Sequence, residues 1–432
     1  MAVDERLDPG DYFAEEDRRE RERLERRARR AARVRRPRRR TGEAGHLSQT
    51  PAGRWLIGLN VAIAAATLIG LVALWPGAVH HHGPSQAFGG PTQTTTVTGA
   101  LNARCPGPTP QTCRVLEVHV GGSTERMTLG PVNTVPKVGK GDRVRISHTQ
   151  LQPGVKRPAG YEDYQLVDLE RQGSMLWIAL LLAVLAIAVL RVRGLLAFAG
   201  VGLSVLVLTK FVVPAILTGE SALLVALVGS LAVMFVTLVL TNGIGAQTFA
   251  AALGITATLG LLGLLAPLFI GFAHLDGHST DLSLVLTQQN SSLSLQGVVL
   301  AGMVIGGLGV LADTAVTQAS AVMALRRADP ELTARGLYHG AFTVGRDHLS
   351  ATIHTLVLAY AGASLPLLLV LRSSGLGFHD ALNAQDIAEP VVATLVGCIG
   401  LVAAVPLTTG LASLLVSRLP PVAIPDGHGH HH

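Results

Sequence analysis

The sequence predicts an all-α polytopic membrane bundle of about eight transmembrane helices, with a small extracytoplasmic β-rich domain inserted after the first helix. Apolar residues make up 49% of the 432-residue chain and charged residues only 15%, and the mean hydropathy is +0.42. Several apolar runs are long enough to cross a bilayer, which takes about 20 helical residues. A polar island after the first run has the short, turn-separated segments that are typical of strands.

Residues 1–53 are predicted to be an Arg-rich cytoplasmic tail that is mostly disordered, because it has almost no apolar face to bury. Most of the chain's net positive charge lies in this tail. Its partners are then the anionic lipids of the inner leaflet, which attract each basic residue by about 1 kcal/mol. The simplest interpretation of the tail is that its positive charge only sets the orientation of the chain in the membrane. Nucleic-acid binding is not favoured, because a membrane helix follows directly.

Residues 54–76 are predicted to be the first transmembrane helix, with Trp55 and Trp75 at its two interfaces. The run is long enough to span the bilayer, and the polar region before it is too long for a signal peptide. Basic residues precede this helix, so the positive-inside rule places its N-terminal side in the cytoplasm.

Residues 80–172 are therefore predicted to be extracytoplasmic. Their short runs, separated by Gly- and Pro-rich turns, indicate a small β-barrel or sandwich. Cys105 and Cys113 flank one of these turns. An oxidising compartment permits a disulfide between them, and two unpaired thiols are the alternative.

Residues 174–418 are predicted to form a seven-helix transmembrane domain, followed by a His-rich cytoplasmic tail at residues 419–432. Seven apolar runs lie at approximately 174–190, 194–213, 221–241, 247–272, 297–325, 349–371 and 389–416. If the chain crosses the membrane eight times, most of the Arg residues in the short connections lie on the cytoplasmic side, as the positive-inside rule requires. Both termini are then cytoplasmic.

Spans two to four and six to eight share short motifs that suggest a parallel repeat, with span five as the connector. Span three ends in VVPAIL (212–217) and span seven has SLPLLL (364–369). Spans four and eight close with TNG (241–243) and TTG (408–410). Some transporters are built from such repeats. Matches this short and this rich in Pro, Gly and Leu also arise by chance, so both interpretations stay open.

Asp313 is the most conspicuous residue of the chain, because it lies within an apolar run long enough to cross the membrane. An acid at the middle of a membrane helix costs about 3 kcal/mol, so it is expected to face a bundle interior or a wet cavity. Small and polar residues share its helical face: Gly302, Gly306, Gly309, Thr317 and Ser320. Gln318 follows directly, so Thr317 and Gln318 join Asp313 as candidates.

Span seven enters the membrane through Arg346, and Asp347, Ser350 and His354 share one of its helical faces. His354 and Asp313 lie at a similar depth, so an acid–imidazole pair is predicted. Imidazole titrates near neutral pH, so such a pair can relay a proton. A purely structural hydrogen bond is the alternative.

The last span adds polar groups at the same depth. Pro406 frees a backbone carbonyl just before Thr408 and Thr409, and freed carbonyls can line a cavity. The leading hypothesis is a proton- or ion-coupled transporter of an unknown small solute. The alternative is a non-transporting envelope scaffold or sensor whose outer domain binds a partner.

No motif nominates an enzyme, a cofactor or a metal. The chain has no HExxH, no Walker-type loop and no Ser/His/Asp order. Its three cysteines are too few for a thiolate metal cluster. The prediction is therefore a protein that is not an enzyme.

Three segments resemble the signature segments of the YibE/F family of bacterial multispanning membrane proteins. They are GGLGVLADTAVTQASAV (306–322), GRDHLSATIHTLVLAYAGASLPLLL (345–369) and LVGCIGLVAAVPLTTGLASL (395–414). Residues 242–259 and the β-rich insert fit the same pattern, so the resemblance covers roughly residues 54–418. The family pattern often has an acid just before the Asp matched by Asp313, where this chain has Ala312. The resemblance implies a bacterial cytoplasmic (inner) membrane and no particular substrate.

Overall fold

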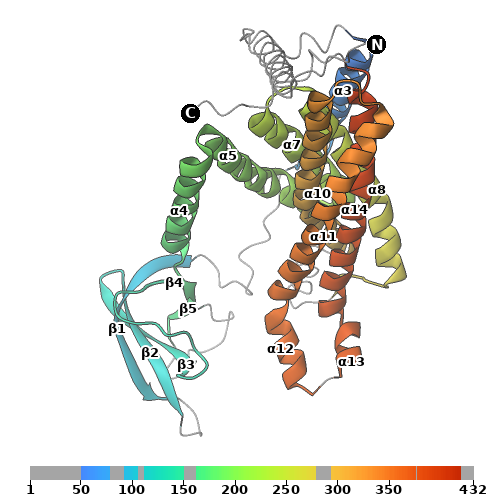
Figure 1. The fold of residues 1–432 in the computed structure, drawn as a ribbon. Coiled ribbons are helices and arrows are strands. Elements are labelled where there is room, and N and C mark those ends of the chain that lie inside the picture. The colour runs from blue at the N-terminus through green and yellow to red at the C-terminus, as the bar shows by residue number, and fades with distance from the viewer. Residues whose placement is uncertain are drawn as a thin grey trace, which may run out of the picture.

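The computed structural model describes residues 50–77, 92–105, 111–149, 162–278, 293–375 and 377–419. The two predicted tails lie almost wholly outside these described residues, so the disorder predicted for residues 1–53 stays a prediction. The described chain is mostly helical, with one small sheet that stands off the helical bundle at the end of a single helix (Figure 1).

Most helices follow the predicted apolar runs, but the run predicted at 349–371 is two helices, the first of which begins already at Ala334. Their bounds are α3 Pro51–Ala73, α4 Gln172–Leu190, α5 Val192–Val207, η2 Leu208–Val212, α6 Val213–Leu217, α7 Ala222–Asn242, α8 Ala246–Phe272, α10 Leu295–Ala328, α11 Ala334–Ala363, α12 Leu365–Ser373, α13 Phe378–Asn383 and α14 Gln385–Val416. Seven of these described helical segments, counting α5 to α6 as one, are long and apolar enough to cross a membrane. The number is eight when the bent pair α11–α12 forms one span.

Both Pro-bearing ends predicted in spans three and seven are breaks in the helix. Pro214 opens α6 directly after a π-helical turn at Leu208–Val212. Pro366 lies in the first turn of α12, whose axis is bent by 54° from that of α11. Proline lacks a backbone N–H and clashes with the preceding turn, so an α-helix cannot pass through either position undisturbed.

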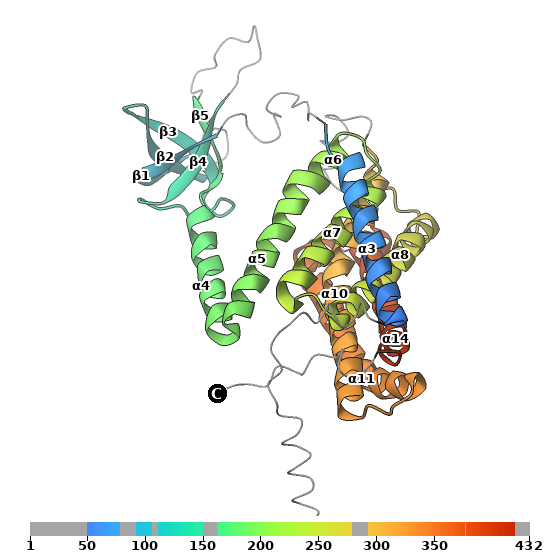
Figure 2. The same cartoon turned by 90° about the horizontal axis from the view of Figure 1, so that it is seen from above.

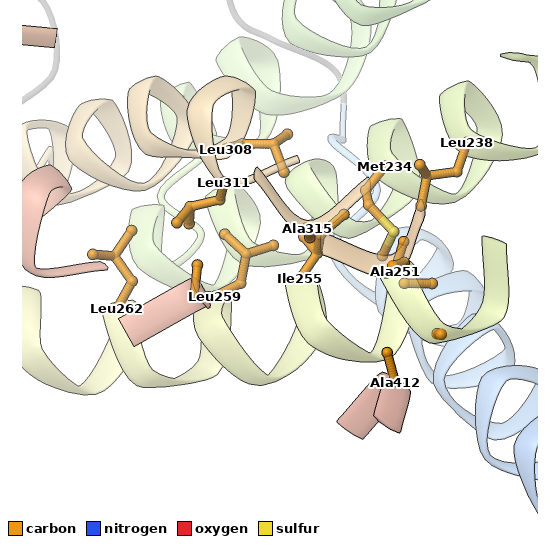
Figure 3. Close-up of a cluster of buried hydrophobic side chains, with 14 of the residues drawn as sticks. Met234, Leu238, Ala251, Ile255, Leu259, Leu262, Leu308, Leu311, Ala315 and Ala412 are labelled. Atoms are coloured by element: carbon orange, nitrogen blue, oxygen red, sulfur yellow. The ribbon is translucent and has the colours of Figure 1, made fainter. Parts of the chain in front are cut away.

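The core of the bundle lies where α7, α8, α10 and α14 meet. Figure 3 shows the side chains of Ile255, Leu259 and Leu262 on α8 beside Leu308 and Leu311 on α10. Small residues let these helices approach closely. Ala250, Ala251 and Ala252 of α8 are all fully or almost fully buried, for example.

The α4 helix is packed quite differently from α10, its counterpart in the proposed repeat. No residue of α4 is buried, whereas α10 buries residues along its whole length. In Figures 1 and 2, α4 and α5 form a hairpin beside the bundle, with the sheet at the far end of α4. The two halves of the proposed repeat therefore differ in their packing.

The sheet has five antiparallel strands: β1 Thr92–Arg104, β2 Thr112–Val120, β3 Ser123–Pro131, β4 Arg143–His148 and β5 Tyr164–Leu169. Their order is β3-β2-β1-β4-β5. The sheet curls so that its edges approach, because Glu162 accepts hydrogen bonds from the backbone N–H and the hydroxyl of Thr128, each 2.7 Å long.

Local sequence explains two turns of the sheet. Gly121 and Gly122 connect β2 to β3 with φ angles of +60° and +92°, which the two-residue hairpin turn requires and which glycine adopts without strain. At the other end of β2, Cys105 and Cys113 form a disulfide, with their Cα atoms 4.9 Å apart. All five strands lie inside the segment 80–172.

Candidate functional site

The candidate site lies between α10 and α11, which run antiparallel. Leu325 contacts Gly340 at one end of their interface, and the hydroxyl of Tyr360 lies against Gly306 toward the other. Between these contacts, Nε2 of His348 lies 3.6 Å from Oδ2 of Asp313. The acid and an imidazole therefore meet on neighbouring spans, as predicted.

The imidazole is His348, however, and the prediction that His354 pairs with Asp313 is corrected. His354 is exposed, and its Nδ1 lies 2.7 Å from the backbone oxygen of Ser350 in its own helix. The prediction chose the wrong side of α11, because His348 continues the buried stripe of this helix and His354 does not.

The Asp313–His348 pair is partly open to its surroundings. The Asp313 side chain is 68% exposed and that of His348 is 38% exposed. Yet Nε2 of His348 is itself buried and has no hydrogen-bond partner among the described residues. A separation of 3.6 Å is longer than an N–H···O hydrogen bond. The pair therefore combines an accessible acid with an imidazole nitrogen that is shielded and close enough to interact with it.

The other candidates of α11 lie away from this pair. Arg346 and Asp347 are exposed, and neither has an ion pair with another described residue. The buried stripe of α11 consists of Leu337, Ala341, Gly345 and Leu356, with His348 between the last two. Asp347, Ser350 and His354 lie on the opposite side of the helix.

A second polar cluster lies on the inner side of α10, where this helix meets α14. Oγ1 of Thr409 donates a 2.8 Å hydrogen bond to Oε1 of Gln318, and both side chains are fully buried. The Gln318 amide also lies against Gly345 of α11, where an added Cβ would come within 2.5 Å of Nε2. Gln318 thus joins α10 to both α11 and α14.

Thr408 faces a different neighbour. Its side chain lies against Gly254 of α8, where an added Cβ would overlap it. Thr317 is half-buried, and no hydrogen bond of its side chain to another described residue is present. The structure therefore brings Gln318 and Thr409 together, with the adjacent Thr408 facing α8 instead. It leaves Thr317 beside them without a polar partner.

Sequence reasoning did not select several polar residues of the site: His348, Thr314, Ser413 and Arg326. The signal for His348 was present, because it continues the apolar stripe of Gly345 at a spacing of three residues. Arg326 is almost buried and donates hydrogen bonds to the backbone oxygens of Pro330, Leu332 and Ser417. It therefore ties the α10–α11 loop to the end of α14.

Away from the spans, Asp276 connects the end of α8 to the start of α14. It accepts hydrogen bonds from the backbone N–H of His278 and from the side chain of Gln385, the latter 2.6 Å long. These bonds stabilise the carboxylate, so the pKa of Asp276 lies below its ordinary value. In the described parts of the chain, no three His, Cys, Asp or Glu residues are grouped so that they could hold a metal ion.

Comparison with known proteins gives one match. A family model described as YibE/F-like protein matches residues 178–418, more than half of the chain. No curated protein and no solved structure matches it. The matched stretch contains α5 to α14 with the Asp313–His348 pair and the Gln318–Thr409 bond, and it leaves out α3 and the sheet. These helices identify the chain as a membrane protein of the YibE/F-like family.

Proposed function

We propose that the protein is a proton- or ion-coupled transporter of a small solute in the bacterial cytoplasmic membrane. The observation that carries the proposal is the Asp313–His348 pair on two neighbouring spanning helices. A carboxylic acid within a membrane helix is costly, and where it occurs it commonly belongs to an ion or proton pathway. Family membership supports the membrane location and gives no substrate.

In this proposal Asp313 exchanges the proton and His348 responds to its charge. The Asp313 side chain is 68% exposed, so its carboxylate is accessible to a proton. The ionised carboxylate of Asp313 attracts the imidazole of His348, 3.6 Å away. When Asp313 takes up a proton, this attraction disappears. The contact between α10 and α11 is then weakened, and the two helices can shift relative to each other.

The test uses the purified protein in liposomes that enclose a pH-sensitive dye. Solutes are first ranked by a thermal-shift screen of the purified protein and then added outside the liposomes. With a transported solute, wild-type protein should change the internal pH. Asp313→Asn should abolish the change, and His348→Gln should slow it by about tenfold or more, the scale expected for a proton-transfer group.

His354→Gln is the matched control, because it removes the same kind of side chain from the same helix without touching Asp313. It should keep the wild-type rate. Wild-type proton movement in folded Asp313→Asn protein would contradict the proposal. Equal losses in His348→Gln and His354→Gln would contradict the role assigned to the pair.

A second candidate is an envelope scaffold or sensor, and the arrangement of the sheet favours it. The sheet is carried by α4 and stands apart from the bundle, so its surface is free for an extracytoplasmic partner (Figures 1 and 2). In this alternative the Arg-rich tail lies at the anionic inner leaflet and carries the signal inside. A scaffold should retain its partner in cells when Asp313 is replaced by Asn, and it should move no protons in liposomes.

A further inference from the structure

Polar side chains without partners gather where α14 meets α10 and α8. They are the hydroxyl oxygens of Thr314, Thr408 and Ser413 and the Nε2 of Gln318, all in side chains at most 1% exposed. None of these atoms has a hydrogen-bond partner among the described residues. Folded proteins leave few buried polar groups unpaired, because each one lost its bonds to water on burial. Four of them in one contact therefore call for an occupant.

Several other hydroxyl side chains of the spanning helices are satisfied within their own helix, although the buried Ser230 of α7 is not. They donate to the carbonyl oxygen four residues earlier, as Thr67, Ser204, Thr256, Thr258, Ser320 and Thr394 do. This bond is the usual solution for a hydroxyl in a helix that lacks water. Thr314, Thr408 and Ser413 do not make it, so their hydroxyl groups remain free for a molecule between the helices.

The register of α10 and α14 places these groups in a column. Gln318 is bonded to Thr409, and Arg326 to Ser417, and both pairs are 91 residues apart in the sequence. The two helices therefore run parallel in constant register over this stretch. Thr314 lies one turn before Gln318, and Ser413 one turn after Thr409. The column is about 12 Å long by helix rise.

The hydrogen-bonding groups of the column determine which kind of molecule can bind there. Nε2 of Gln318 can only donate hydrogen bonds, whereas the hydroxyls can donate or accept. An occupant must therefore accept a hydrogen bond. The hydroxyls and the amide are uncharged, so a neutral occupant fits them without the cost of burying an ion. Water accepts and donates, and a buried water needs two to four polar partners.

We propose that water molecules are bound where α14 meets α10 and α8, by Thr314, Gln318, Thr408 and Ser413. The proposal does not depend on transport, since it follows from the unpaired atoms alone. Such water would keep α10 hydrated on its inner side, opposite the accessible Asp313.

The test is the sign of a change in thermal stability. Thr314→Val, Thr408→Val and Ser413→Ala each remove one hydroxyl and little volume. With bound water, each change takes away a partner of that water, and the Tm of the purified protein should fall by about 2 °C or more. In a dry contact, removal of an unpaired hydroxyl relieves a penalty, and the Tm should rise.

Thr258→Val is the matched control, because Thr258 is equally buried and is satisfied by the backbone oxygen of Gly254. Its Tm should stay within about 1 °C of wild type, since the hydroxyl meets no water there. An unchanged or raised Tm in the three column variants would overturn the proposal.

A second measurement needs no variant. X-ray radiolysis generates hydroxyl radicals at bound water, and mass spectrometry locates the side chains that they oxidise. Val322, level with Ser413 beside the column, should be oxidised in wild-type protein. Leu259, in the apolar core (Figure 3), should not. Absence of oxidation at Val322 would likewise overturn the proposal.

Discussion

At the scale of single residues, glycines determine how closely the polar helices approach. Gly345 lets α11 lie against the Gln318 amide, and Gly254 lets α8 lie against Thr408. Both contacts are too close for any side chain. In a membrane, where burial of apolar surface gives helices little reason to associate, such close approach is a principal source of stability.

Replacement of Gly345 by Ala should therefore destabilise the bundle. The new Cβ would come within 2.5–2.7 Å of three atoms of the buried Gln318 amide, so either the side chain or the helix must move. Overpacking of this kind costs about 1–3 kcal/mol. The measurement is the thermal unfolding of the purified variant.

Gly302→Ala is the control for this change, because a Cβ at Gly302 meets no atom within 4 Å. It should be neutral or stabilising by up to about 1 kcal/mol, since alanine loses less chain entropy on folding. Equal unfolding temperatures for the two variants would show that the Gly345 contact is loose.

The sequence predicted the residue types of the site better than their partners. Asp313 was expected to pair with His354 in the bundle interior, whereas the structure places His348 beside it and leaves its side chain 68% exposed. Helix rise fixes depth only to about one turn, and it does not say which side of α11 faces α10. The apolar stripe ending at Gly345 contains that information. His348 follows Gly345 by three residues and so lies on the same side of the helix as the stripe. Asp347 lies on the opposite, more polar side, which is easier to notice in the sequence.

At the scale of helices and strands, hydropathy predicted where the spans lie but not how they pack. The α4 helix is more apolar than α8, yet α4 buries no residue whereas half of the most apolar stretch of α8 is buried. Lipid is as apolar as a leucine-rich helix, so apolarity alone gives no reason for burial. The small residues at Ala250, Ala251, Ala252 and Gly254 explain why α8 lies inside.

The bond between Gln385 and Asp276 ties α14 to α8 at one end of the bundle, and it should make stability depend on pH. Because the pKa of Asp276 is lowered from 3.8, its bonds stabilise the fold above that pH. The stabilisation is lost as pH falls through the folded-state pKa. Gln385→Ala should lower the Tm at about pH 6, and the difference from wild type should disappear toward about pH 3.

Asn383→Ala is the control for the pH series. The Asn383 amide donates to the backbone oxygen of His379 within α13 and lies 3.2 Å from Nδ1 of that histidine, and it makes no hydrogen bond to an acid among the described residues. Any change that it causes should be the same at both pH values. A constant difference between wild type and Gln385→Ala across the series would contradict the assigned role of Asp276.

The disulfide should stabilise the hairpin of β1 and β2. Replacement of Cys105 and Cys113 by Ser removes a cross-link that closes a short loop, which is worth about 2–3 kcal/mol. Proteolysis of the full-length variant within the sheet should begin at lower temperature than in wild type. Cys398→Ser on α14 should not alter it. Three reactive thiols in the unfolded, unreduced wild-type protein would contradict the pairing.

At the scale of the whole molecule, the protein consists of a helical bundle and a small sheet that stands apart from it (Figures 1 and 2). The bundle has seven or eight helices that can span a membrane, depending on how the bent pair α11–α12 is counted. The predicted count of about eight agrees with the larger number. The bend at Ser364 was not predicted, although Pro366 was noted, because a proline shows where a helix is weakened and not how far it turns.

The count of spans decides which ends of the helices lie in the cytoplasm, so labelling of single cysteines tests the whole arrangement. In a Cys398→Ser background, cysteines replace Ser123 in the sheet and Ser374 after α12. With eight spans and a cytoplasmic N-terminus, both should react with a membrane-impermeant maleimide added to intact cells. Cysteines at Ala334, before α11, and Ser417, after α14, should react only after the cells are permeabilised. The reasoning is that Arg326, Arg327, Arg335 and Arg418 flank the second pair, and basic residues remain on the cytoplasmic side.

If α11 and α12 form a re-entrant segment instead of one span, positions 334 and 374 would be labelled from the same side. Labelling of position 334 in intact cells would therefore rule out eight spans and require a new assignment of the side from which Asp313 is reached.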